Sequence, residues 1–185
     1  MKKVYIIHGW AMDSNMSWIK WLEKELSKKN IEVHALDMPN ANQPKIEEWV
    51  DYLKKNVKGL DEESFFVGHS VGCQTILRFL EKEPKELKIG GCVFVAPWID
   101  LVGLEGITSQ ELAIAHPWLN NKINFERVLE HTGKITCIFS TNDRFVSQDE
   151  WKKFENGLNA KLIIKKDFGH FEKTERIEEI LHELK

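Results

Sequence analysis

Apolar and polar positions follow two different periods along the chain. Runs that are apolar at nearly every position are typical of strands covered on both faces, and they occupy 3–7, 32–36, 64–67, 91–95, 136–140 and 161–165. Between these runs, apolar residues at helical spacing predict helices over 17–27, 44–57, 71–79, 149–154 and 175–184. Pro44 marks the start of the second helix and Gly59 its end, and Gly157 is the expected stop of the fourth. Alternating strands and helices with short connections predict an α/β protein, a three-layer sandwich whose mainly parallel sheet lies between helices.

One connection is much longer than the others. Residues 96–134 separate the fourth strand from the fifth, and within them Thr108 is followed by Glu111 at capping-box spacing, which predicts a short helix. A further short helix is expected near 125–129. The connection is too short for a domain but long enough to shape a pocket. We therefore expect one domain over 1–185, with 96–134 shaping a pocket.

The composition is that of an ordinary globular protein. Of the 185 residues, 42% are hydrophobic and 30% charged, which suits one domain with its own core. Lys and Arg (26) nearly balance Asp and Glu (29), and a net charge of −3 gives no broad attraction to nucleic acid or an anionic membrane. No apolar run approaches the roughly 20 residues of a membrane span, and the opening apolar stretch stops at His8, too early for a secretion signal. We expect no nucleic-acid partner and no membrane partner.

Cysteine usage and nucleotide motifs add little chemistry. Three cysteines without CxxC spacing are typical of reduced core thiols, which predicts a cytoplasmic protein. No P-loop, GxGxxG or EF-hand pattern occurs, and we expect no cofactor. The sequence does not indicate an oligomeric state.

The third strand runs directly into Gly68-His69-Ser70-Val71-Gly72, a G-x-S-x-G pattern between a strand and a helix. This spacing puts a serine on a sharp turn with strained backbone angles, and the flanking glycines keep the strand and the helix from colliding. The start of the following helix directs N–H groups and a positive dipole at the same point. Ser70 is therefore the candidate nucleophile.

A serine nucleophile needs a base, and the base needs an orienting acid. In a strand–turn–helix setting the chain order is serine, acid, histidine, and Asp143 and His170 follow the fifth and sixth strands in that order. Gly169 gives the backbone freedom to aim the histidine ring. Asp100, after the fourth strand, is the rival acid. The alternative interpretation is that Asp143 stabilises its own turn or caps the next helix, and that His170 is an ordinary loop residue.

Backbone amides near the candidate nucleophile provide for an oxyanion hole. The amide of Val71 directly follows Ser70, and the amide of Trp10 follows Gly9 after the first strand. His8, before that glycine, is expected to be a buried structural group.

A metal site is the remaining chemical alternative. His69, inside the G-x-S-x-G pattern, is expected to be packed or hydrogen-bonded, like His8. Together with His170 and Asp143 these histidines lack the local spacing of a zinc site, so we expect no metal.

Aromatic residues gather in the loops beyond the predicted strand ends. A pocket for an apolar group would be built from such side chains, and the candidates are Met12, Trp98, Trp118, Phe145 and Phe171. The alternative is that these loops only pack on one another.

Several segments together resemble one known family. They are Val4-Tyr5-Ile6-Ile7-His8-Gly9-Trp10, the G-x-S-x-G segment, Ala96-Pro97-Trp98, Asn142-Asp143 with Phe145, and Gly169-His170-Phe171. They resemble α/β-hydrolases, and more closely the small serine hydrolases of the retinoblastoma-binding-protein-9 and YdeN group. The resemblance implies a compact α/β-hydrolase fold without a large cap and a six-stranded sheet of order 2-1-3-4-5-6. No Leu-x-Cys-x-Glu segment occurs, so binding to a retinoblastoma-type protein is not implied.

These features predict a serine hydrolase with a Ser70–His170–Asp143 triad that hydrolyses a small ester through an acyl-enzyme. A small-molecule ester or amide is the expected partner. The alternatives are a serine aminopeptidase or amidase, and a non-catalytic protein-interaction module on a hydrolase frame. A cofactor-free haloperoxidase or an acyltransferase is a more remote alternative that would use the same triad.

Overall fold

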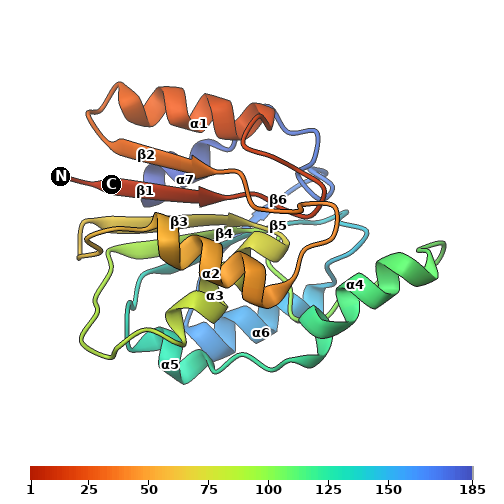
Figure 1. The fold of residues 1–185 in the computed structure, drawn as a ribbon. Helices are drawn as coiled ribbons and strands as arrows, with labels where there is room; N and C mark the ends of the chain where they lie inside the picture. Colours follow the sequence, from red (N-terminus) through yellow and green to blue (C-terminus); the bar gives the residue numbers. More distant parts are fainter. Residues whose placement is uncertain (185) are drawn as a thin grey trace.

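The computed structural model describes residues 1–184, and these form a three-layer α/β sandwich (Figure 1). The strands are β1 (Lys3–Ile7), β2 (Glu32–Leu36), β3 (Ser64–His69), β4 (Gly91–Val95), β5 (Ile135–Ser140) and β6 (Lys161–Lys165). The helices are α1 (Ser17–Ser27), α2 (Ile46–Asn56), α3 (Val71–Leu80), α4 (Ser109–Asn120), α5 (Phe125–Leu129), α6 (Gln148–Leu158) and α7 (Glu178–Glu183). All neighbouring strands pair in parallel, and their order is β2-β1-β3-β4-β5-β6. The predicted fold class and strand order are confirmed.

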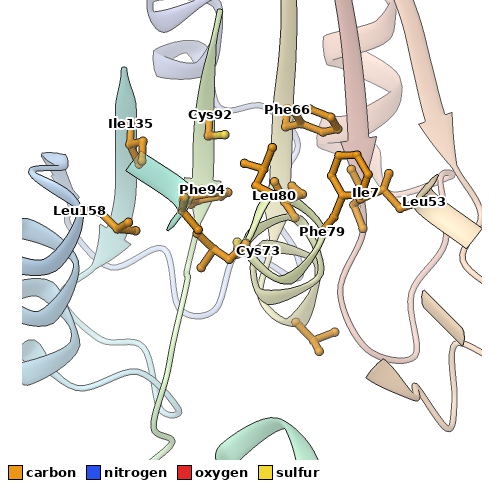
Figure 2. Packing of buried hydrophobic residues seen from close by; sticks show 14 of the residues in the cluster. Ile7, Leu53, Phe66, Cys73, Phe79, Leu80, Cys92, Phe94, Ile135 and Leu158 are labelled. Carbon is orange, nitrogen blue, oxygen red and sulfur yellow. The ribbon is translucent and has the colours of Figure 1, made fainter. Parts of the chain in front are cut away.

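The sheet separates two apolar cores. On one face, α1 and α7 cover a cluster that includes Ile6, Val67 and Val95. On the other face, α2, α3 and α6 cover a larger cluster, and Figure 2 shows Phe79 and Leu80 of α3 among side chains of the sheet. Because the central strands β3, β4 and β5 are buried at every position, both of their faces need apolar residues, which explains why most of their positions are apolar.

Parallel strands bring their carboxyl ends to one edge of the sheet, and the connections that follow them therefore meet there. The chain termini lie at the opposite edge (Figure 1), where Lys2 Nζ donates a hydrogen bond to the Leu184 carbonyl oxygen at 2.7 Å.

The ends of three helices differ from the sequence predictions. Gly157 does not stop α6, which continues to Leu158 and ends at Asn159 in the left-handed conformation (φ 50°). Gly157 instead makes room for a neighbouring helix, because a Cβ atom there would lie 2.5 Å from the Phe125 ring. Helix α2 begins at Ile46, after Pro44, and α7 spans only Glu178–Glu183.

The long connection folds over the carboxyl edge of the sheet. Helix α4 starts with the predicted capping box between Thr108 and Glu111, continues through Pro117, and projects beyond the rest of the molecule (Figure 1). Only Ala115 and Trp118 of this helix are buried. The connection adds α4 and α5 but no large cap over the edge where the candidate site lies.

Candidate active site

Ser70 stands on a strained turn between β3 and α3. Its backbone has φ 53° and ψ −122°, a conformation that L-residues rarely adopt. A Cβ atom at Gly68 would lie 2.9 Å from the Cys73 nitrogen, and one at Gly72 would lie 2.5 Å from the carbonyl oxygens of Ile7 and His8. Both glycines are needed because strand and helix approach so closely, as the G-x-S-x-G spacing predicts.

The structure brings His170 to Ser70 from a distant part of the chain. His170 Nε2 lies 2.9 Å from Ser70 Oγ, although the two residues are 100 positions apart. Gly169 (φ 56°) and Phe171 (φ 60°) on either side of His170 are both in the left-handed region. This sharply bent loop after β6 directs the ring toward the end of β3.

Asp143 contacts the far side of the same ring. Its Oδ2 atom accepts a hydrogen bond from His170 Nδ1 at 2.7 Å, and its Oδ1 atom accepts from the backbone amides of Phe145 (2.9 Å) and Val146 (3.2 Å). The carboxylate therefore stabilises its own turn and also holds the histidine, with one oxygen for each task. Both side chains are buried, 7% exposed for His170 and 2% for Asp143.

The rival acid lies elsewhere. Asp100 is 63% exposed and pairs with Lys153, its Oδ2 atom 2.5 Å from the lysine nitrogen. Sequence order alone did not decide whether Asp143 or Asp100 orients the histidine, whereas the contacts favour Asp143.

Polar residues at the end of β5 hold the histidine loop, and the sequence reasoning missed their role. Asn142 Oδ1 accepts a hydrogen bond from the Gly169 amide at 2.7 Å, and Ser140 Oγ accepts one from the Phe168 amide at 2.9 Å. The only signal in the sequence for this role was a polar residue, Asn142, directly before the candidate acid Asp143.

Two backbone amides beside the cavity have no hydrogen-bond partner in the described part of the chain. Within residues 1–184 the backbone N–H groups of Trp10 and Val71 have no hydrogen-bond acceptor, and both residues line the cavity above Ser70. The Trp10 loop is fixed by its neighbour Ala11, whose amide donates to the Ala41 carbonyl oxygen at 2.8 Å. Buried or half-buried amides without a partner are uncommon, and at such a site they can receive a developing oxyanion.

A cavity of about 560 Å³ opens over Ser70. Its walls are mostly apolar with charged groups among them, and the lining residues are Trp10, Ala11, Met12, Ser70, Val71, Trp98, Leu101, Gly103, Leu104, Glu105, Gly106, Ile107, Glu111, Ala115, Arg144, Phe145, His170 and Glu172. Met12, Trp98 and Phe145 lie where the sequence placed them. Half of the lining residues belong to the long connection after β4.

Two predicted pocket residues are not in the cavity, and for these the prediction is wrong. Trp118 is 2% exposed, packs edge-on against Trp49 and donates its indole N–H to the Pro44 carbonyl oxygen at 3.0 Å. Phe171 is fully buried, because the left-handed turn after His170 directs it into the core beside Phe168. Both therefore pack in the interior, the alternative considered for the loop aromatics.

His8 and His69 have structural contacts. His8 Nε2 accepts a hydrogen bond from the Met38 amide at 2.9 Å, and burial lowers the pKa of its ring. His69 donates from Nε2 to the carbonyl oxygen of His170 at 2.8 Å, which ties the serine turn to the histidine loop. Burial, reinforced by the nearby His170 ring, lowers the pKa of His69 to about 3. His69 thus stays neutral beside the candidate base.

The low pKa of His69 predicts an acid-sensitive fold. Below about pH 6.5 the unfolded chain binds a proton at this residue and the folded chain does not, so the free energy of unfolding falls by up to about 1.4 kcal/mol per pH unit toward pH 3. Above pH 6.5 the contribution is complete. His69→Gln keeps an amide donor for the His170 carbonyl oxygen. In this variant, the slope of the free energy of unfolding against pH should be smaller by the equivalent of about one bound proton. Urea unfolding between pH 7 and pH 4.5 measures it, and equal slopes in both proteins would contradict the assignment.

Three further findings concern residues 1–184 only. No group of three or more His, Cys, Asp or Glu side chains is arranged to hold a metal ion. No helix has the length and apolar character that crossing a membrane requires. Cys73, Cys92 and Cys137 are free and buried, and burial raises the pKa of each thiol.

Comparison with known proteins places the chain among hydrolases. Residues 4–180 match the family described as Serine hydrolase. YdeN of Bacillus subtilis (strain 168) is 30% identical over 170 residues, which are 92% of this chain and 86% of YdeN. The serine hydrolase RBBP9 of Rattus norvegicus is 24% identical over 159 residues, 85% of this chain and 80% of RBBP9.

Solved structures agree with these sequence matches. The crystal structure of the ydeN gene product from B. subtilis matches with a TM-score of 0.88 and 28% identity, covering 100% of this chain and 98% of that one. Est1E from Butyrivibrio proteoclasticus matches with a TM-score of 0.72 at 16% identity, covering 99% of this chain and 85% of its own, which is a likeness of fold alone.

Proposed function

The chain belongs to the serine hydrolase family, and on that premise we propose that it hydrolyses small carboxylic esters through an acyl-enzyme. Ser70 is the nucleophile, His170 the general base and acid, and Asp143 the group that orients the imidazole. The observation that carries the proposal is the continuous line of contacts from Ser70 Oγ to His170 Nε2 (2.9 Å) and from His170 Nδ1 to Asp143 Oδ2 (2.7 Å). Nucleophile, base and orienting acid have this arrangement in enzymes that transfer acyl groups.

Acylation begins when Ser70 Oγ attacks the ester carbonyl carbon. His170 Nε2 takes the hydroxyl proton, and Asp143 stabilises the imidazolium ion that results. The negative charge on the carbonyl oxygen is stabilised by the free amides of Trp10 and Val71. His170 then gives its proton to the leaving alcohol, and the acyl group remains on Ser70.

Deacylation repeats the sequence with water. His170 removes a proton from a water molecule, the resulting hydroxide attacks the acyl carbon, and the same two amides receive the second oxyanion. The bond between carbon and Ser70 Oγ then breaks, and His170 returns the proton to the serine oxygen. The protein's own groups complete every proton transfer in this cycle.

The cavity favours a small substrate. A volume of about 560 Å³ is within the range of small-molecule sites, and Trp10, Met12 and Phe145 give it apolar walls. Residues 1–184 form no large cap that could enclose a long lipid. Short or aromatic acyl groups are therefore the proposed substrates.

One observation favours an amine-bearing substrate as a second candidate. Glu105, Glu111 and Glu172 line the cavity. Glu111 is engaged in the capping box of α4, and Glu172 lies 3.9 Å from Arg144, but Glu105 has no ion pair or hydrogen bond among the described residues. A free carboxylate at the cavity wall can bind the ammonium group of an aminoacyl ester or amide, which an aminopeptidase requires.

A matched panel of substrates tests both candidates. We expect p-nitrophenyl acetate and butyrate to be hydrolysed, and the protein quenched in acid during turnover to carry one acyl group by intact mass. Aminoacyl p-nitroanilides, and the same compounds N-acetylated, distinguish the second candidate, because only the free amines should respond to Glu105→Gln. Hydrolysis of no ester and no amide by the folded protein would contradict the proposed function.

A further inference from the structure

The indole N–H of Trp98 points directly at the candidate nucleophile. Trp98 Nε1 lies 3.1 Å from Ser70 Oγ, and the residue is only 3% exposed. We propose that Trp98 is a further catalytic residue: its N–H donates a hydrogen bond to Ser70 Oγ, orients the hydroxyl proton toward His170 and stabilises negative charge on the serine oxygen. The inference rests on the proposed function and adds a third group that contacts the reacting atom.

The direction of this hydrogen bond follows from the chemistry of the indole. The ring nitrogen can only donate, so Ser70 Oγ must accept from Trp98. The serine hydroxyl has one proton and rotates freely. With one lone pair engaged by Trp98, the proton is directed to His170 Nε2, 2.9 Å away, and the remaining lone pair is left to attack the substrate carbon.

Buried polar contacts hold Trp98 in place. Gln74 Nε2, on the nucleophile helix α3, donates to the Trp98 carbonyl oxygen at 3.1 Å. The orientation of this amide is determined, because Arg78 donates to Gln74 Oε1 from two nitrogens, at 2.9 and 3.3 Å. On the other side, the amide of Ile99 donates to the buried carboxylate of Glu150 at 2.5 Å. These residues position Trp98, and none of them lines the cavity.

The charge of Arg78 has no carboxylate partner within the described residues, and carbonyl groups satisfy it. Besides Gln74, its guanidinium donates to the carbonyl oxygens of Trp118 (3.2 Å) and Asn121 (2.7 Å), at the carboxyl end of α4. A helix carries partial negative charge at that end, which favours a cation there. Helix α4, the Trp98 loop and the nucleophile helix are thus joined around one buried cation.

The hydrogen bond has its largest effect in two transition states. During acylation, the serine proton moves to His170 while Oγ forms a bond to the acyl carbon, and Trp98 stabilises the negative charge on Oγ as the proton leaves. During deacylation, the bond between carbon and Oγ breaks, its electron pair stays on Oγ, and Trp98 stabilises that charge until His170 returns the proton. Trp98 keeps its own proton throughout. Hydrogen bonds to charged groups are stronger than those to neutral groups, so removal should slow both steps.

An isosteric replacement tests the hydrogen bond separately from packing. Replacing Trp98 with β-(3-benzothienyl)alanine puts sulfur in place of the N–H group and keeps the shape of the ring. We expect the rate constants for Ser70 modification by a fluorophosphonate and for deacylation after one turnover of p-nitrophenyl acetate both to fall about 10- to 100-fold. KM should change little, because the ring surface is kept. Trp98→Phe provides a second variant without the donor.

Trp49 is the matched control. It is fully buried, and its indole N–H donates to the Pro39 carbonyl oxygen at 2.8 Å, away from Ser70. The same isostere at Trp49 should leave both rate constants within about two-fold of the native values. A Trp98 isostere that reacts as fast as the native protein would overturn the inference and leave the proposed function intact. Absence of any Ser70 adduct on the native protein would overturn both.

Discussion

Replacing Ser70 with Ala is expected to lower kcat/KM for an ester by at least about 10⁴-fold while leaving the thermal midpoint nearly unchanged. The variant loses only the oxygen atom, and this oxygen is the nucleophile in the proposed cycle. Its hydrogen bonds are to His170 and Trp98 at a strained turn, so we expect the fold to be kept when it is removed. Initial-rate kinetics with p-nitrophenyl butyrate and a melting curve measure the two quantities.

The same experiment includes a test of cooperation. Residues that act as one unit are strongly non-additive, so His170→Ala should cost about as much as Ser70→Ala, and the double variant no more than either. Independent roles would instead multiply the losses. Ester hydrolysis by Ser70→Ala above about 10% of the native rate would show that another group is the nucleophile.

Asp143→Asn is the second substitution with a large expected effect, a loss of about 10³- to 10⁴-fold in kcat. The amides of Phe145 and Val146 both donate to Asp143 Oδ1, so the asparagine oxygen should keep that position and turn its NH₂ group toward His170. An NH₂ group cannot accept from His170 Nδ1, and the ring proton would then move to Nε2. In that tautomer Nε2 cannot take the serine proton, so the loss appears in kcat, measured with p-nitrophenyl butyrate.

Asp100→Asn is the control for this substitution. Asp100 also follows a strand of the sheet, but it is mostly exposed and pairs with Lys153. Because exposed ion pairs contribute little, the control should retain activity within about two-fold. Equal losses in the two variants would mean that Asp143 is not the orienting acid.

Much of the fold could be predicted because its signals are local. The unbroken apolar run of β4 and the apolar spacing of α1 each predict one element, and the predicted bounds of both agree with the structure. The positions of Ser70, Asp143 and His170 after the third, fifth and sixth strands were also readable, since parallel strands bring their carboxyl ends to one edge. Local pattern and topology together were enough to predict which parts of the chain meet.

Features that depend on how loops pack were not predictable. Trp118 and Phe171 carry no sequence signal that distinguishes a buried ring from a cavity wall, and the difference comes from one backbone turn and one hydrogen bond. The contact of Trp98 with Ser70 depends on where the loop after β4 places Trp98, and there Gln74, 24 positions away, donates to the Trp98 carbonyl oxygen. Gly157 fits both a helix stop and a close helix contact, and only the position of the neighbouring helix decides between them.

The most direct test of the central claim is covalent labelling with a fluorophosphonate probe, followed by intact-mass measurement of the native protein and of Ser70→Ala. An activated serine predicts one adduct on the native chain and none on the variant. No adduct on the folded native protein, or an adduct that persists in Ser70→Ala, would contradict the claim. In the first case a non-catalytic interaction module would become the leading interpretation, and in the second another residue would be the nucleophile.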